Sequence, residues 1–429
     1  MPQPFSLTVI NARQTARVQA LLAPARDRDR ATERRVTTIV DRVRRQGDRA
    51  LLSYARQFDG LREPVEVSRD EMKAAAAGVP KDVRAAIGKA AAHIRTVARR
   101  QVPKGWRVRV APGIEVEQRV TALDRVGCYV PGGRYPLPSS LLMTAIPAVA
   151  AGVGEVVAVC PRPEPSVMAA ALEAGISRLF RVGGAHAVAA LAYGTQTIPR
   201  VDKIVGPGNR YVAAAKSLVA SDCGIDFYAG PSEILIVASS GRADWLAADL
   251  IAQAEHDPDA RAVLVTPSAQ LAARVARAVA AQLPATGPAR TALRAHGGII
   301  VTRSLDEAIA LANAAAPEHL VVDDDRTAAR IACAGSIFIG SWSAQVAGDY
   351  ALGSNHVLPT SGAARVRGGL SAADFVRQVT VQRVTERGLR GIGPTVATLA
   401  ATEGLMAHAA SVQMRLSSSG RTARARGGR

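Results

Sequence analysis

The chain has 429 residues, of which 48% are hydrophobic and 4% aromatic, and its 54 Lys+Arg against 36 Asp+Glu give a formal net charge of +18. This length is more than one hydrophobic core usually covers, so two or more domains are expected. No uninterrupted apolar run of about 18 residues occurs, which argues against a membrane span. The excess of arginine, with so few aromatic residues for base stacking, favours a composition bias over nucleic-acid binding.

Two features bear on the cellular compartment. The segment MPQPFSLTVINARQTARVQA at the start lacks the compact apolar core of a secretory signal. The four cysteines are scattered, without a Cys-x-x-Cys pair: Cys128, Cys160, Cys223 and Cys333. Free thiols in a reducing cytoplasm fit this pattern better than a disulfide framework, so we expect a cytoplasmic protein.

Helical periodicity dominates the first part of the chain. Segments such as ATERRVTTIVDRVRRQGDRALLSYARQF and DVRAAIGKAAAHIRTVARRQ carry apolar residues at helical spacing. We therefore treat residues 1–125 as an N-terminal helical segment, and we expect it to pack on the second of the two α/β units that follow. His93 lies on one of these helices without neighbouring ligands, which indicates a surface or packing role.

Strands alternate with helices from residue 126 onward. The first series, over 126–231, contains the strands VGCYV, EVVAVC, RLFRV and KIVG. The second series, over 232–370, contains EILIVA, AVLVT, GIIVT, LVV and SIFIG. This alternation predicts two α/β units side by side, each with a parallel sheet covered on both faces. Residues 371–416, including FVRQVT and PTVATLAATEGLMAHAASVQMRL, are expected to be helical, and 417–429 to form a disordered basic tail.

Three glycine turns join strands to helices in the first α/β unit. They are Pro131-Gly132-Gly133, Gly183-Gly184 and Gly206-Pro207-Gly208-Asn209. Glycine lets backbone amides approach a phosphate at the carboxyl ends of the strands, but none of the turns is a G-x-G-x-x-G fingerprint. A tight turn that needs positive φ explains any one of them equally well, whereas three at one end of a sheet favour a nucleotide. His186 follows the second turn, where packing and a cofactor contact both remain open.

Four of the seven histidines stand in short polar clusters in the second half of the chain. Gln253 and His256 are three apart on a predicted helix and share a face, although such a pair is often only a surface polar pair. Together with Asp349 and His408 they make a nitrogen and oxygen set suited to zinc, or to manganese in a more open geometry. The adjacent Glu318 and His319 could serve two different proton transfers or form a satisfied hydrogen-bonded pair.

Seven motifs in order along the chain resemble those of the histidinol dehydrogenase family. They are VGCYVPGG, VDKIVGPGN, AGPSEILIVA, AQAEHDPDA, APEHL, GDYALGSNHVLPT and EGLMAH, and the resemblance runs from about residue 30 to 415. It implies that the two α/β units are incomplete Rossmann-like, doubly wound domains. It also implies one zinc ion per site, held by the residues at four positions: Gln253, His256, Asp349 and His408.

The same resemblance implies the remaining site residues. Glu318 and His319 supply acid–base catalysis. NAD⁺ is contacted by Tyr129 and Asn209, and by His186 where the family usually has glutamine. The substrate is contacted by the four zinc ligands and by further residues, the full set being Ser232, Gln253, His256, His319, Asp349, His356, Glu403 and His408.

The implied reaction is the oxidation of L-histidinol to L-histidine with two NAD⁺, through histidinaldehyde, at the end of histidine biosynthesis. His319 takes the hydroxyl proton, Glu318 activates water onto the aldehyde, and His319 acts again in the second oxidation. The family is a homodimer, in which the C-terminal segment with Glu403 and His408 reaches into the partner's site.

The chain departs from the family pattern at His186, and one of its segments resembles related enzymes with another substrate; each observation leaves an alternative open. The imidazole of His186 cannot reproduce the hydrogen-bond geometry of an amide, which bears on NAD⁺ binding. The segment ARVRGGLSAADF also resembles paralogues with the same zinc and NAD⁺ machinery that oxidise another small polar alcohol, such as a hydroxylated sulfonate. A hypothesis from another functional class is a basic nucleic-acid-binding protein that has lost catalysis. The intact set of site residues argues against it.

Overall fold

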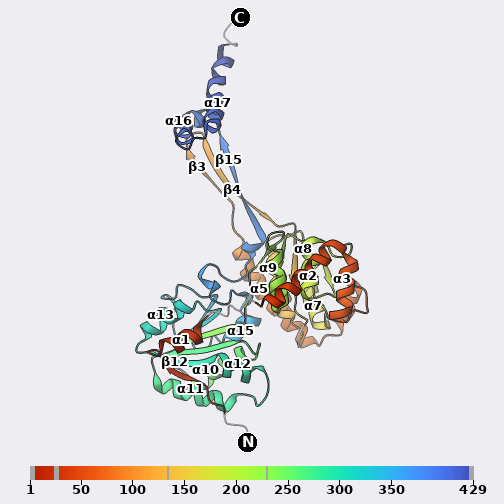
Figure 1. Cartoon of the computed structure of the whole chain (residues 1–429), viewed down its shortest axis with the longest axis vertical. Coiled ribbons are helices and arrows are strands. Elements are labelled where there is room, and N and C mark those ends of the chain that lie inside the picture. The colour runs from red at the N-terminus through yellow and green to blue at the C-terminus, as the bar shows by residue number, and fades with distance from the viewer. Residues whose placement is uncertain (1–4, 24–28, 133–134, 229, 425–429) are drawn as a thin grey trace. The chain divides into compact units, whose positions relative to one another are not determined.

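The computed structural model describes residues 5–23, 29–132, 135–228 and 230–424. The chain divides into two compact units (Figure 1). The first unit comprises residues 1–102 and 123–375, and the second comprises residues 103–122 and 376–429. Both predicted α/β series therefore belong to the first unit, and the second is built from two segments distant in sequence.

The first α/β series forms a six-stranded sheet in which all neighbours are parallel except the antiparallel edge pair β2–β7. The strands, in spatial order, are β2 (Glu66–Val67), β7 (Arg178–Phe180), β6 (Glu155–Val159), β5 (Arg125–Tyr129), β8 (Lys203–Val205) and β9 (Gly224–Ile225). The connecting helices are α6 (Pro138–Ala150), α7 (Pro165–Ala174), α8 (Gly184–Tyr193) and α9 (Arg210–Val219). Strands buried on both faces carry continuous apolar runs, as the sequence shows.

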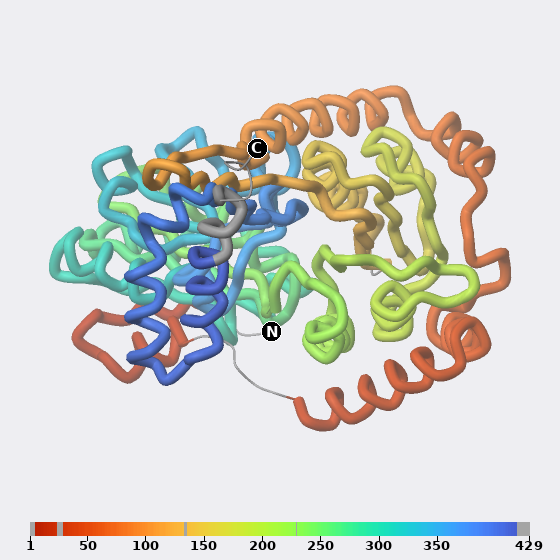
Figure 2. The backbone as a smooth tube through the Cα atoms, turned by 90° about the horizontal axis from the view of Figure 1, so that it is seen from above, coloured from red at the N-terminus to blue at the C-terminus, as the bar shows by residue number. Residues whose placement is uncertain are grey.

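The N-terminal helices pack on this first sheet, and the expectation that they cover the second is wrong. These helices are α2 (Arg30–Gln46), α3 (Asp48–Tyr54), the π-helix η1 (Ala55–Asp59), α4 (Arg69–Ala77) and α5 (Lys81–Gln101). Val36, Val40 and Val43 form one apolar face of α2, which packs in the core shared with α8 and α9. Figure 2 shows these red-to-orange helices flanking the yellow and green part of the chain.

The second α/β series forms a parallel six-stranded sheet. Its strands, in spatial order, are β1 (Val9–Asn11), β12 (Gly297–Val301), β11 (Arg261–Thr266), β10 (Glu233–Val237), β13 (His319–Val322) and β14 (Ser336–Ile339). Its helices are α1 (Thr15–Leu22), α10 (Ala243–Ala254), α11 (Ala269–Gln282), α12 (Pro288–His296), α13 (Leu305–Ala315), α14 (Asp325–Ala328) and α15 (Gln345–Tyr350). Of the described N-terminal residues, Phe5 and Leu7 pack in the core of this sheet, together with β1 and α1.

Both sheets use the same strand order. Counting along each series, the third, second, first, fourth and fifth strands lie side by side, which is the doubly wound arrangement. The order reverses between β5 and β8 in the first sheet and between β10 and β13 in the second. The prediction of two doubly wound α/β units is confirmed by this topology.

The second unit contains an antiparallel three-stranded sheet in the order β15-β4-β3. Its elements are β3 (Trp106–Ala111), β4 (Ile114–Ala122), β15 (Val376–Val384), α16 (Glu386–Thr402) and α17 (Met406–Arg424). The prediction of helix for FVRQVT is wrong: Val376–Thr380 belong to β15, where valine and threonine have high strand propensity and the segment pairs with β4. Disorder from 417 is also wrong as far as 424, where α17 continues, and 425–429 lie outside the described residues.

No disulfide links the described residues, and Cys128, Cys160 and Cys223 are buried as free thiols. Burial raises the pKa of the Cys160 and Cys223 thiols to about 11, which keeps both protonated near neutral pH. Among the helices of the described residues, none combines the length and apolar character needed to cross a bilayer.

Candidate active site

The candidate catalytic pair lies at the amino end of the second sheet, beside the point where its strand order reverses. Glu318 immediately precedes β13, and His319 is its first residue. His319 pairs in register with Ile234 of the adjacent strand β10. The first residue of β10, Glu233, therefore stands next to both members of the pair, and its main chain holds them.

The main chain of Glu233 fixes the orientation of both side chains. The Glu233 amide donates to Oε2 of Glu318 at 2.7 Å, and the Glu233 carbonyl oxygen lies 3.1 Å from Nδ1 of His319. A carbonyl can only accept, so Nδ1 of His319 carries a proton there and Nε2 faces away from the strand. Both side chains are buried, with 6% and 5% of their surface exposed for Glu318 and His319.

The electrostatics of the pair suit proton transfer. Burial raises the pKa of Glu318 to about 7, so this carboxyl can gain or lose a proton near neutral pH. Burial alone would lower the pKa of His319, but the charges of Glu318 and Asp349 raise it to about 9. Nε2 of His319 lies 3.6 Å from Oδ1 of Asp349, too far for a hydrogen bond, and it has no hydrogen-bond partner among the described residues.

Asp349, on α15, connects His319 to a second histidine. Its Oδ2 accepts from Nε2 of Gln345 at 2.9 Å, and its carbonyl oxygen lies 2.8 Å from Nδ1 of His356. Burial opposes ionisation of Asp349, but the adjacent His319 and the charges of His356 and His256 hold its pKa below the usual value. Burial lowers the pKa of His356, which favours the neutral imidazole.

His256 follows the carboxyl end of α10, and its Nδ1 lies 3.1 Å from the carbonyl oxygen of Ala252 and 3.2 Å from that of Gln253. His256, His319 and His356 thus share one arrangement, in which Nδ1 faces a main-chain carbonyl. Each therefore has Nε2 available for a ligand. Metal-binding and proton-transferring histidines are commonly oriented in this way.

The side chain of Gln253 is the most unusual polar group of the site. Gln253 is 0% exposed, and neither Oε1 nor Nε2 has a hydrogen-bond partner among the described residues. A buried amide without partners costs free energy, so the position calls for a ligand that satisfies it. Its amide oxygen, the imidazole nitrogen of His256 and the carboxylate of Asp349 are donors that zinc accepts.

The remaining expected ligand and substrate residues are distributed over both units. Ser232 is half-buried and directly precedes β10, next to Glu233. Glu403, at the end of α16, and His408, on α17, are exposed and belong to the second unit. Within the described residues, no three or more His, Cys, Asp or Glu side chains gather as a metal site. The first unit alone therefore provides at most part of the expected zinc coordination.

The expected cofactor residues lie at the opposite, carboxyl end of the first sheet. Tyr129 ends β5, and its buried hydroxyl accepts a hydrogen bond from the Gly184 amide at 3.0 Å. Asn209 is exposed and caps α9, where its Oδ1 accepts from the amides of Tyr211 at 3.0 Å and Val212 at 3.2 Å. The capping role explains Asn209 structurally and leaves its amide nitrogen available for a ligand.

His186, on α8, is buried and turned toward the N-terminal helices. Its Nε2 lies 2.8 Å from Oδ2 of Asp59, which also accepts from the Gly183 amide at 3.0 Å. The rings of Tyr54 and Phe58 lie about 6 Å from the imidazole, at 6.0 and 6.1 Å between ring centroids. Of the three glycine turns, the first includes Gly133, which lies outside the described residues.

Sequence reasoning missed two carboxylates that hold these sites together. Glu233 binds Arg261 at 3.2 Å and accepts from the Ser361 amide at 3.0 Å. Asp59 binds both His186 and the Gly183 amide. The sequence signal for Glu233 is a charged residue at the start of an otherwise apolar strand, as in SEILIVA. Asp59 has no such signal, because its partners are more than 120 residues away in the sequence.

Comparison with known proteins gives a consistent result. The family model described as "Histidinol dehydrogenase" matches residues 23–416. The histidinol dehydrogenase of Bradyrhizobium diazoefficiens is 47% identical over 414 residues, covering 93% of this chain and 96% of that protein. The protein of the same name from Methanothermobacter thermautotrophicus is 47% identical over 394 residues, covering 89% and 92%. The crystal structure of histidinol dehydrogenase from Elizabethkingia anophelis superimposes with a TM-score of 0.92 at 34% identity, covering 97% and 99%.

Proposed function

This chain belongs to the histidinol dehydrogenase family, and we propose that it oxidises L-histidinol to L-histidine through histidinaldehyde, with reduction of two NAD⁺. One observation supports this proposal most directly. A carboxyl and an imidazole, Glu318 and His319, are both fixed by the main chain of one residue, Glu233, in a buried polar site. Such a pair can carry the two kinds of proton transfer that a four-electron oxidation needs.

NAD⁺ supplies the hydride acceptor in both oxidations. The first oxidation needs the neutral form of His319, whose pKa of about 9 makes that form more abundant as the pH rises. Nε2 of the neutral imidazole takes the proton of the substrate hydroxyl while the carbon loses a hydride, which leaves the aldehyde. Glu318, whose pKa is raised by burial to about 7, then takes a proton from water as the oxygen adds to the aldehyde carbon, and protonated His319 returns its proton to the carbonyl oxygen, which gives the hydrate. His319, after releasing its first proton, takes the hydroxyl proton of the hydrate as the second hydride leaves, and the carboxylic acid results.

We further propose that Gln253, His256 and Asp349, with His408, hold one zinc ion. The donor set fits, because the buried Gln253 amide lacks any partner in the described part of the chain, and His256 has Nε2 available. Zinc would bind the amino and imidazole nitrogens of the substrate and so fix its orientation. Ser232, His356 and Glu403 complete the proposed substrate contacts.

The proposed enzyme is a homodimer in which Glu403 and His408 serve the partner's site. Both residues are exposed on the second unit. To test this, a Glu318→Gln protein is mixed with a His408→Asn protein under conditions that allow subunit exchange. A hybrid dimer then has one site with both changes and one with neither, so random pairing restores about a quarter of wild-type activity. Verified hybrids without activity would contradict the shared site.

The overall reaction is tested by its stoichiometry. Purified protein supplied with L-histidinol, Zn²⁺ and excess NAD⁺ should form two NADH for each histidinol consumed, with histidine as the product. One NADH per alcohol would contradict the four-electron reaction. Turnover of another small polar alcohol, with none of histidinol, would instead identify the paralogous activity that the segment ARVRGGLSAADF raises.

A further inference from the structure

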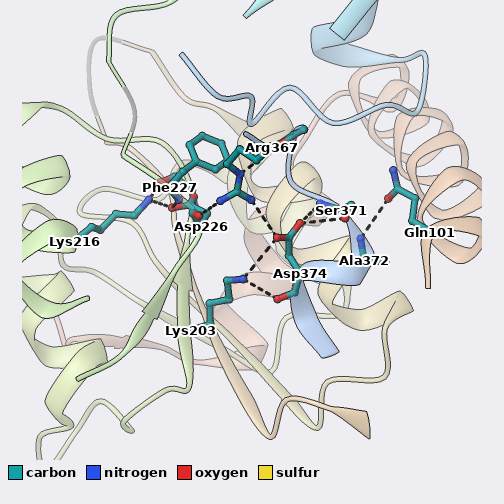
Figure 3. A network of polar contacts seen from close by, with 11 residues as sticks. Gln101, Lys203, Lys216, Asp226, Phe227, Arg367, Ser371, Ala372 and Asp374 are labelled. Carbon is teal, nitrogen blue, oxygen red and sulfur yellow. Dashed lines mark hydrogen bonds and ion pairs between the residues drawn. The ribbon is translucent and has the colours of Figure 1, made fainter. Parts of the chain in front are cut away.

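A network of partly and fully buried charged side chains connects the last glycine turn of the first sheet to residues 357–375 (Figure 3). Lys216 of α9 and Asp226, which follows β9, form its innermost ion pair, with residue exposures of 3% and 4%. None of the charged residues in this network has a role in the proposed reaction. Burying such a pair costs desolvation free energy, so its geometry needs an explanation.

The ion pair holds both polar groups of Gly206, the first residue of the turn that ends at Asn209. Oδ2 of Asp226 accepts from the Gly206 amide at 2.8 Å, and Nζ of Lys216 donates to the Gly206 carbonyl oxygen at 3.0 Å. Gly206 has a φ of +115°, and a Cβ there would lie 2.2 Å from the carbonyl oxygen of Tyr129. The turn is therefore fixed directly against Tyr129, and only glycine fits.

Arg367 holds the Asp226 loop from the other side. Its Nη1 donates to the carbonyl oxygen of Asp226, and its guanidinium lies 4.5 Å from the centroid of the Phe227 ring. Its Nη2 donates to Oδ1 of Asp374 at 3.1 Å, and Oδ2 of Asp374 accepts from the Ser371 amide at 2.8 Å. Figure 3 shows the Arg367 side chain between Phe227 and Asp374.

The segment that carries Arg367 is itself anchored next to His356. The Leu370 amide donates to the carbonyl oxygen of Val357, the neighbour of His356, at 2.9 Å. Val357, Leu370 and Phe375 are buried in the core beneath the first sheet. Hydrogen bonds lead from the Gly206 turn through Asp226, Arg367 and Asp374 to Ser371, and the adjacent Leu370 bonds Val357, the residue beside a proposed substrate contact.

We propose that Arg367 is a positioning residue for the dinucleotide: through Asp226 it holds the Gly206–Asn209 turn in the conformation that receives NAD⁺. The inference rests on the proposed function, because that function assigns Tyr129 and Asn209 to NAD⁺. Arg367 suits this role because one planar guanidinium can bridge a carbonyl, a carboxylate and an aromatic face simultaneously. A lysine ammonium at that position can satisfy only some of these contacts.

The test compares Arg367→Met, Arg367→Lys and the control Arg365→Met in the full-length protein. Arg365 is exposed in the same segment and also donates to a main-chain carbonyl, that of Ala314, so its removal matches the loss of charge and of one such bond. Calorimetry gives the Kd for NAD⁺, and steady-state kinetics give kcat and both KM values. Thermal unfolding shows whether each variant is folded at the assay temperature.

Arg367→Met should raise the Kd and KM for NAD⁺ about tenfold, the effect of losing a hydrogen bond to a charged group. kcat at saturating NAD⁺ and the KM for histidinol should stay within about threefold, Arg367→Lys should recover part of the affinity, and Arg365→Met should change it less than about twofold. A folded Arg367→Met protein with a lowered Tm and unchanged Kd would overturn the proposal.

If Arg367→Met does not fold, the lysine variant decides, and an unchanged Kd there overturns the proposal equally. The binding comparison needs no turnover. A wild-type protein that binds NAD⁺ without oxidising histidinol would therefore refute the proposed function and still test the role of Arg367.

Discussion

The two sheets of the first unit have the same strand order, yet the residues expected to act lie at opposite ends of them. In the first sheet, Tyr129 and the Gly206 turn stand at the carboxyl ends of β5 and β8, where the order reverses. This is the usual ligand-binding edge of doubly wound sheets. In the second sheet, Ser232 and Glu318 stand at the amino ends of the equivalent strands, β10 and β13.

At the carboxyl end of the second sheet, one exposed side-chain contact links the segments that follow its two central strands. Oδ2 of Asp323 accepts from both the amide and the hydroxyl of Ser239, each at 2.7 Å, directly beyond β13 and β10. With the same topology, the residues expected to bind NAD⁺ therefore lie at the carboxyl edge of the first sheet, and those expected to act on the substrate lie at the amino edge of the second. Strand order indicates where a ligand can bind, but the residues at each edge decide whether it does.

The largest loss of activity is expected for His319→Asn, which tests whether the chemistry occurs at the amino end of the second sheet. His319→Asn should lower kcat for histidinol oxidation by about 10³-fold, since it removes the proposed general base. Its Kd for NAD⁺ should not change. The control Asp323→Asn, at the carboxyl end of the second sheet, should leave kcat within about twofold, because that change only weakens an exposed hydrogen bond to Ser239. A larger loss of kcat in Asp323→Asn than in His319→Asn would indicate that the chemistry occurs at the carboxyl end of the second sheet.

A second, smaller effect tests whether the amino end of the second sheet is a metal site. Gln253→Leu should weaken Zn²⁺ binding about 10- to 100-fold, the usual cost of disturbing a metal's ligands or their supports. In metal-free protein the same change should leave the free energy of unfolding unaltered or raise it by about 1 kcal/mol, because a buried unpaired amide is removed. Metal titration and urea unfolding of the apoprotein measure the two quantities. Strong destabilisation of the apoprotein would show that the amide has a structural role instead.

The smallest expected effect concerns the carboxyl end of the first sheet. His186→Gln should change the Kd for NAD⁺ only about two- to threefold, toward tighter binding, because an amide can bind Asp59 and still offer a second polar group. The free energy of unfolding should fall by about 1 kcal/mol through the weaker contact with Asp59. Calorimetry with NAD⁺ and urea unfolding give both values; no change in either would remove His186 from the cofactor side.

The strand and helix order of both sheets could be predicted, because buried parallel strands carry continuous apolar runs between helical segments. The strand β15 was missed for a physical reason: most of its residues are exposed, so it lacks the apolar run that marks a buried strand. The packing of α2 was misplaced because an apolar helix face shows that a core is near but not which core.

Local spacing brought Gln253 and His256 to attention as residues three apart on one predicted helix. The helix α10 ends at Ala254, however, so His256 lies beyond it and is exposed, whereas Gln253 is fully buried. The role of Glu233 could not be foreseen, because it depends on β10 pairing with β13 across more than 80 residues of sequence. The same holds for Asp59 and His186. Pairings of this kind are properties of the tertiary fold, and a single sequence does not specify them locally.

The long separation between β4 and β15 has a consequence for synthesis. Ala122 of β4 pairs with Val376 of β15, so about 250 residues must be made after the β3–β4 hairpin before its third strand exists. During translation the edge of β4 therefore stays unpaired, and such an edge is prone to associate with other chains. The helices with Glu403 and His408 follow still later. We expect nascent chains to be most vulnerable to aggregation in this interval.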